Sequence, residues 1–117
     1  MRPLGAMLLG IGLLAPSLAV AGDYAPLDCA KARSAAERTI CKSYELGQDE
    51  ARMATLYAVA TSLVAMGQRG EIQDQQRDWL KTREACGDHV ACLGHAYAAR
   101  VPRLNGVIES IASHGPF

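Results

Sequence analysis

Apolar residues recur three or four positions apart along most of this chain, which is the spacing of helices that bury one face. No stretch alternates apolar and polar residues at period two, as a half-buried strand would. The clearest helical stripe is Leu93, Tyr97, Val101, Leu104, Ile108 and Ile111. The pattern predicts four helical segments. The first three span about 34–42, 43–66 and 71–86. The fourth starts near His89, with Asp88 as its expected N-cap.

Local signals mark where these helices should begin and end. Ser34 followed by Glu37 forms the capping-box pattern that starts a helix. The segment Gly67–Gly70 predicts the stop after the second helix. Pro102 interrupts the last stripe and removes a backbone N–H, so we expect a kink near Ala98–Pro102 or two shorter helices there.

Short connections between the segments predict antiparallel neighbours. We expect an all-α fold, a small disulfide-stapled bundle of about four helices, in which the second and third form a hairpin and the fourth packs across it. Trp79 should join a core of Leu, Ile, Met, Ala and Tyr side chains. Such a thin core favours disulfides as added support. The expected organisation is one domain, residues 22–117.

The first 21 residues are typical of a secretory signal peptide. Arg2 supplies the positive start, residues 4–14 the apolar run, and Ala19-Val20-Ala21 the small-x-small cleavage pattern. The run is shorter than the ~20 apolar residues that span a membrane, which disfavours an anchor. Pro26-Leu27-Asp28 disfavours lipidation of Cys29. We therefore expect a periplasmic or secreted protein, with no membrane insertion of the mature chain.

Four cysteines follow the signal: Cys29, Cys41, Cys86 and Cys92. An even number in an exported chain indicates disulfides, and three pairings are open. We favour Cys29 with Cys41 and Cys86 with Cys92, each closing a loop worth roughly 2–3 kcal/mol. Crossed pairs would close longer loops, so energy does not decide. The local pairing requires residues 29–33 to fold back, because in one helix Cys29 and Cys41 would lie about 18 Å apart.

Charge and spacing argue against several classes of function. The chain has 12 basic and 12 acidic residues. Cleavage of the predicted signal would remove Arg2 and leave 11 basic against 12 acidic residues. This balance gives no net positive potential that would attract nucleic acid. No nucleophile set, phosphate loop or convergent acid and base is recognisable, so we expect neither an enzyme nor a bound cofactor. The cysteine spacings do not fit a zinc site, and His89 and His95 are six apart, so no metal site is expected.

The charged residues are most simply interpreted as solvated helix surface. Asp49 and Glu50 are adjacent, so on a helix they face different directions. Basic residues of the third helix alternate with acids and predict an exposed, salt-bridged face: Arg77, Lys81 and Arg83. Arg83 also follows Trp79 by four residues, which would allow its guanidinium to stack on the indole.

Two sequence blocks together are similar to a known family. The first is Asp28-Cys29-Ala30-Lys31-Ala32 through Glu37-Arg38-Thr39-Ile40-Cys41, followed by Leu46. The second is Gln76-Arg77-Asp78-Trp79-Leu80-Lys81-Thr82-Arg83-Glu84-Ala85-Cys86, then Cys92-Leu93, Tyr97 and Arg100. The pattern resembles the lysozyme inhibitor LprI N-terminal domain family of exported bacterial proteins, over about Leu27 to Leu104.

The resemblance implies a small helical, disulfide-containing domain of the cell envelope. It also implies lysozyme binding and inhibition, since the family takes its name from a mycobacterial lipoprotein that inhibits lysozyme. The motif residues take structural roles in this comparison: Trp79, Arg83, Tyr97 and Arg100. We expect the two arginines to bond acids such as Glu37. The family indicates no inhibitory residue that maps onto this chain, so the partner-binding surface is left open.

Two features depart from the family pattern. The chain lacks the lipidation site of the founding protein, and it has Val101-Pro102 where the family usually continues its last helix unbroken. The first departure argues against membrane anchoring. The alternative function is a non-catalytic periplasmic protein-binding or structural module with a different envelope partner.

Overall fold

Four α-helices and one short 3-10 helix follow one another along residues 27–114, the part of the chain that this structure, a computed structural model, describes. In chain order they are η1 (Cys29–Lys31), α1 (Ala35–Lys42), α2 (Tyr44–Leu63), α3 (Met66–Ala85) and α4 (Val90–Ser113). No strand occurs within these residues, so the predicted all-α bundle of about four helices is confirmed. The predicted signal at 1–21 lies outside the described residues.

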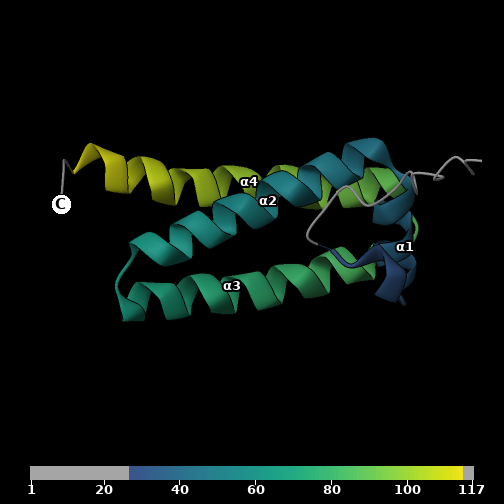
Figure 1. The fold of residues 1–117 in the computed structure, drawn as a ribbon, viewed down its shortest axis with the longest axis horizontal. Helices are drawn as coiled ribbons and strands as arrows, with labels where there is room; N and C mark the ends of the chain where they lie inside the picture. The colour runs from purple at the N-terminus through teal and green to yellow at the C-terminus, as the bar shows by residue number, and fades with distance from the viewer. Residues whose placement is uncertain (1–26, 115–117) are drawn as a thin grey trace, which may run out of the picture.

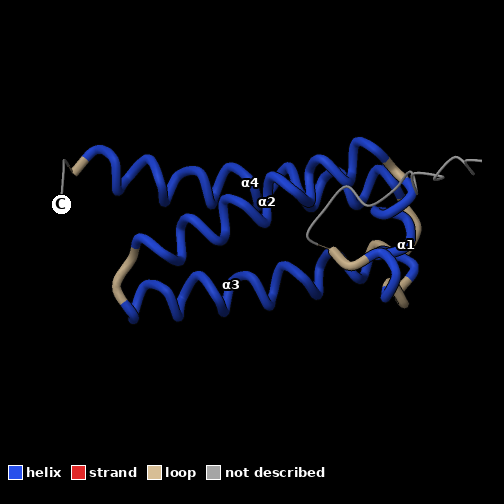
Figure 2. The backbone as a smooth tube through the Cα atoms, in the orientation of Figure 1, coloured by secondary structure: helices blue, strands red, loops and turns tan. Residues whose placement is uncertain are grey.

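The three long helices lie side by side, and the short α1 covers one end of them (Figure 1). α2 and α4 run in the same direction and α3 runs opposite to both, with the short connections that Figure 2 shows. The most extensive contact between elements joins α2 to α4, although α3 separates them in sequence. We call the end that carries α1 and the α3–α4 turn the stapled end, and the end that carries the α2–α3 turn the far end.

The core is built from the inner faces of all four α-helices. Its largest fully buried side chains are Tyr97, Ile40, Leu93 and Leu104. Each large apolar side chain of this kind contributes roughly 1.5–3 kcal/mol when buried. Trp79 is buried as predicted, whereas Leu80 is only partly buried and Leu63 is 51% exposed. Within residues 27–114, no helix combines the length and hydrophobicity of a membrane-spanning segment.

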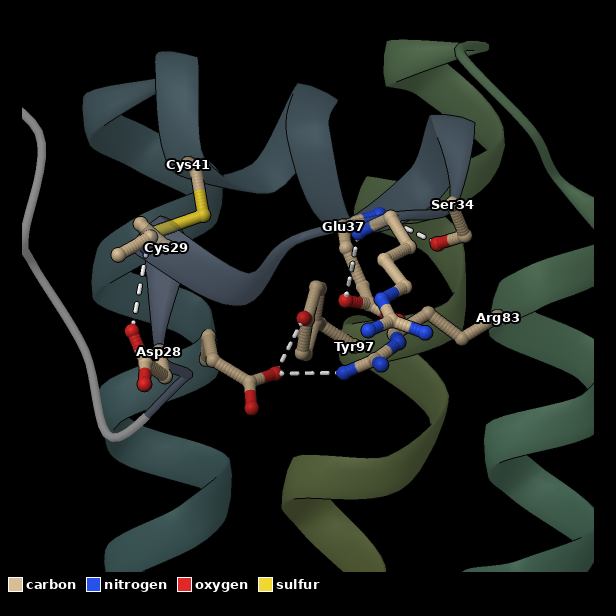
Figure 3. Close-up of a disulfide and its surroundings, with 10 residues drawn as sticks. Asp28, Cys29, Ser34, Glu37, Cys41, Arg83 and Tyr97 are labelled. Carbon is tan, nitrogen blue, oxygen red and sulfur yellow. Dashed lines mark hydrogen bonds and ion pairs between the residues drawn. A yellow bond between two sulfur atoms is a disulfide. The ribbon is translucent and has the colours of Figure 1, made fainter.

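Both disulfides close small loops at the stapled end, and they are the two favoured pairs. Cys29 bonds Cys41 with 5.8 Å between their Cα atoms, and Cys86 bonds Cys92 with 5.5 Å. η1 provides the fold-back that the first pair requires. Asp28 caps this short helix by accepting a hydrogen bond from the N–H of Ala30 at 3.1 Å. Figure 3 shows the first disulfide beside this turn.

Serine caps begin the first two α-helices. Oγ of Ser34 accepts a hydrogen bond from the N–H of Glu37 at 3.0 Å (Figure 3). Oγ of Ser43 accepts one from the N–H of Leu46 at 3.3 Å. The carboxylate of Glu37 accepts from the N–H of Arg33 at 3.4 Å, so the start of α1 is supported from both sides. The predicted Ser34 cap of α1 is therefore confirmed, while the return bond of the capping box goes to the N–H of Arg33 rather than to that of Ser34.

The predicted stop after α2 is misplaced. α3 begins at Met66, so Gly67–Gly70 lies inside its first turns. The guanidinium of Arg69 donates from Nε to the carbonyl of Thr61 at 2.7 Å and from Nη2 to that of Val64 at 3.3 Å. These bonds satisfy carbonyls that the end of α2 leaves open. They support an early start of α3. Each glycine there lowers the stability of the helix by only about 1 kcal/mol relative to alanine.

Of the two alternatives predicted at Pro102, a kink or a division of the fourth helix, the division is wrong. α4 runs as one helix with Pro102 inside it, rather than as two shorter helices. Arg100 and Leu104, on either side of the proline, are both buried. The buried face of α4 therefore continues past Pro102, although the proline has no backbone N–H to donate. The predicted cap at Asp88 is also wrong, because the N-cap residue is His89 and no side chain caps the helix. The Cys86–Cys92 disulfide holds the entry to α4 instead.

Candidate functional site

Three polar side chains from three helices meet in the interior next to the stapled end. Glu50 comes from α2, Arg83 from α3 and Tyr97 from α4, and none is more than 5% exposed. Nη1 of Arg83 donates to Oε2 of Glu50 at 3.1 Å, and the Tyr97 hydroxyl donates to the same oxygen. Figure 3 labels Arg83 and Tyr97. We call these residues the polar cluster. One carboxylate thus connects all three long helices.

The polar cluster keeps its charges away from water. Arg83 also donates from Nη2 to the carboxylate of Glu84 at 3.0 Å, while its Nε is buried without a hydrogen-bond partner among the described residues. Burial raises the pKa of the Tyr97 hydroxyl, and the charge of Glu50 and the hydrogen bond to it raise this pKa further, against the opposing charge of Arg83. Tyr97 therefore stays protonated at neutral pH and remains a donor.

Trp79 packs against the polar cluster and joins α3 to α4. Its indole Nε1 donates to the carbonyl of Ala96 at 2.8 Å. The guanidinium carbon of Arg83 lies 5.6 Å from the centre of the indole ring, so the stacking predicted from their spacing is present. The Tyr97 ring meets the indole edge-on, with 5.2 Å between centroids and 60° between planes.

Arg100 makes a second buried connection between α4 and α3. Its Nε donates to Oε1 of Gln76 at 2.9 Å and its Nη2 to the carbonyl of Ile72 at 3.3 Å. The Gln76 amide donates in turn to Sδ of Met53 on α2, at 3.1 Å. Arg100 is 3% exposed, and both of its acceptors are neutral. Burial lowers the pKa of Arg100, and the nearby charge of Arg103 lowers it further.

The structure brings the predicted motif residues together but gives the arginines different partners. No ion pair joins Glu37 to either arginine within residues 27–114; its carboxylate accepts a hydrogen bond from the main-chain N–H of Arg33. Arg83 pairs with Glu50, and Arg100 uses uncharged acceptors. The prediction that Glu50 is solvated is therefore wrong. Glu50 lies on the buried face of α2 and is the central acid of the polar cluster.

Sequence reasoning missed two interior polar residues, and their spacing carried a signal for both. Glu50 lies four residues after Leu46 and three before Met53, within the apolar stripe of α2. Gln76 occupies the equivalent place on α3, four residues after Ile72 and three before Trp79. A polar residue that continues an apolar stripe lies on the buried face, where it needs a hydrogen-bond partner.

Four other charged residues of α3 form two exposed ion pairs on the surface. Asp74 pairs with Arg77, and Asp78 pairs with Lys81 at 3.8 Å, with all four side chains exposed. The predicted salt-bridged face is therefore confirmed for Arg77 and Lys81 and wrong for Arg83. Exposed pairs of this kind contribute at most about 1 kcal/mol each.

The buried bonds described above are suited to fixing one packing of the helices. The Glu50 carboxylate receives two donors, and such buried networks specify a structure because breaking them leaves polar groups unsatisfied. Within residues 27–114, no three His, Cys, Asp or Glu side chains are grouped to hold a metal ion. The histidines are exposed, at His89, His95 and His114.

Comparison of the chain with protein-family models, with curated proteins and with solved structures gave no match. The similarity to the lysozyme inhibitor family therefore stays a prediction from two sequence blocks. The cysteines and motif residues of those blocks have the structural places given above.

Proposed function

We propose that this chain is an exported protein of the cell envelope that binds lysozyme and inhibits it. The observation that carries the proposal is that the family-like blocks form one structural unit. Their cysteines make both disulfides, and Trp79, Arg83 and Tyr97 pack together beside them. A rigid scaffold whose polar motif residues are bonded inward acts through its surface, as a protein-binding inhibitor does.

The two disulfides support a periplasmic or secreted location. Such bonds form and persist in oxidising compartments, and they are rare where thiols are kept reduced. The signal peptide predicted at residues 1–21 would direct export and be removed near Ala21. Lysozyme acts on the cell wall, so an exported inhibitor would meet it there.

We place the contact with a cationic enzyme such as lysozyme at the acidic side chains near the start of α2. Glu45 is exposed and Asp49 is partly exposed, and at four residues apart they share one side of the helix. Glu50 does not belong to this surface because it is buried. Complementary charge at such a patch would steer association and fix its orientation.

A turbidity assay of cell-wall lysis by lysozyme, with the purified and oxidised protein, tests this function. We expect inhibition at micromolar protein and weaker inhibition by the double variant E45Q/D49N. The matched control is E71Q/D74N, which removes two exposed carboxylates from α3 and should inhibit like the unmodified protein. Undiminished lysis at micromolar protein with both disulfides intact would remove the proposal.

A second candidate is a non-catalytic envelope module that binds a different protein, and the far end favours it. Met66 is 83% exposed, Leu63 51% and Val59 37%. Exposed apolar side chains near one another are typical of protein interfaces. Capture of one specific envelope protein that is lost in L63N/M66N, but kept in the control V90N at the stapled end, would favour this function over lysozyme inhibition.

A further inference from the structure

A groove of about 350 Å³ lies between α3 and α4 on the outer side of the bundle. Its lining residues come from both helices: Gln75, Asp78, Trp79 and Thr82 of α3, and Ala99, Arg100 and Arg103 of α4. The groove therefore combines a tryptophan side chain with polar groups of both charges. Concave sites with a few convergent polar groups are where small ligands bind.

The α4 side of the groove carries two arginines that lack a counter-ion. No ion pair joins Arg100 or Arg103 to an acid within residues 27–114. Arg100 is buried and donates only to neutral oxygens, which leaves part of its five-donor guanidinium for another acceptor. Burying a cation without a counter-ion costs free energy, which an anion bound nearby would offset. An anion in the groove would compensate both arginines at once.

The α3 side of the groove favours a peptide carboxylate over a phosphate. Asp78, which also pairs with the exposed Lys81 at 3.8 Å, would repel a doubly charged phosphate, yet its carboxylate oxygens can accept hydrogen bonds from peptide N–H groups. Gln75 and Thr82 can donate and accept, which matches the alternating groups of a peptide backbone. Trp79 and Ala99 supply apolar surface for a small side chain.

We propose that this groove binds the terminal carboxylate of a short peptide, with Arg100 and Arg103 bonding the carboxylate and Asp78 accepting from its N–H groups. The site goes beyond the proposed inhibition of lysozyme and does not depend on it. It lies between α3 and α4, whereas the acidic surface proposed for lysozyme is at the start of α2.

Tryptophan fluorescence can report the binding, because the only tryptophan of the chain lines the groove. The probe is N-acetyl-alanyl-alanine with a free carboxylate, titrated into the oxidised protein. The comparison ligands are the same peptide with an amidated end and inorganic phosphate. We expect a saturable change with the free acid, binding of the amide weaker by about tenfold or more, and weaker binding of phosphate than of the acid.

Exposed residues of the groove provide variants that should fold normally. R103Q should weaken binding of the free acid by about tenfold, the effect of one lost charge-assisted hydrogen bond, and leave the amide unaffected. R77Q is the matched control, because Arg77 is an exposed arginine of α3 outside the groove. D78N should weaken the peptide and strengthen phosphate, since it removes the repelling charge.

Three results would overturn this site: equal binding of acid and amide, equal effects of R103Q and R77Q, or tighter binding of phosphate than of the peptide. Lysozyme is absent from the titration. Failure here therefore leaves the proposed inhibition standing, and failure of the turbidity assay leaves this site standing.

Discussion

The stapled end and the far end of the bundle are held by different kinds of interaction. At the stapled end, two disulfides and the polar cluster connect the helices through covalent bonds and buried charges. At the far end, α2 and α3 are joined by a two-residue turn at 64–65, and Arg69 binds the carbonyls at the end of α2. Leu63 and Met66 are left exposed there. Stability is thus concentrated at one end, and unfolding should begin at the other.

The largest expected effect comes from removing the charge at the centre of the polar cluster. E50Q keeps the shape of the side chain but removes the buried acid beside Arg83, which among the described residues then keeps only the partly exposed Glu84 as an acidic partner. We expect the free energy of unfolding to fall by about 3 kcal/mol, as for other broken buried pairs. Urea unfolding measures this change.

E45Q is the control for that variant, because it removes an exposed carboxylate from the same helix. It should change stability by no more than about 0.5 kcal/mol. Equal losses in E50Q and E45Q would mean that the polar cluster does not stabilise the stapled end.

Removal of the first disulfide should have the next largest effect. C29S/C41S opens a loop with a sequence separation of 12, which costs roughly 2–3 kcal/mol in the chain-entropy model. Thermal unfolding measures the loss, and hydrogen exchange locates it. Exchange should rise in α1 and change little at the α2–α3 turn; a uniform rise along the chain would contradict a separate stapled end.

Alkaline pH should weaken the stapled end through Tyr97. Its pKa is raised in the folded protein, so above the unfolded value of about 10 the unfolded chain binds fewer protons than the folded one. Stability is therefore present below that pH and falls as pH rises above it, by up to about 1.4 kcal/mol per pH unit.

Urea unfolding as a function of pH tests this sign. Y97F should lose this alkaline dependence, whereas the control Y44F should keep it because Tyr44 is 63% exposed. If the free energy of unfolding of Y97F still fell with rising alkaline pH at the same slope, the loss would belong to other groups.

The smallest expected effect is at the far end. R69Q removes two side-chain bonds to the last carbonyls of α2, for a loss of about 1 kcal/mol. Hydrogen exchange should rise near Leu63 and remain unchanged in the polar cluster. R52Q, which removes an exposed arginine of α2, is the control. Loss of protection around Tyr97 in R69Q would show that the two ends unfold together.

Features that depend on neighbouring residues could be predicted from the sequence. The cap at Ser34 follows from the residues next to it, and helical spacing predicts four helices and most of their buried faces. The two favoured disulfides join cysteines only 12 and 6 positions apart, although loop energy alone does not select this pairing. The stacking of Arg83 on Trp79 also follows from a spacing of four on one helix.

Features that depend on distant partners could not be predicted in the same way. Glu50 is 33 residues from Arg83 and 47 from Tyr97, so no local spacing identifies them as partners. Gln76 and Arg100, 24 residues apart, pose the same problem. The start of α3 was misplaced because the bonds from Arg69 reach back across the turn and support a helix that begins in glycine-rich sequence.

The parallel pairing of α2 and α4 has a consequence for how the chain folds. These helices share the most extensive contact, yet all of α3 lies between them in sequence. The disulfides link residues only 12 and 6 positions apart. Neither therefore shortens the loop that must close to bring α2 against α4. The slow step of folding is then closure of the long loop through α3, and its rate should be nearly the same in the oxidised and the reduced chain.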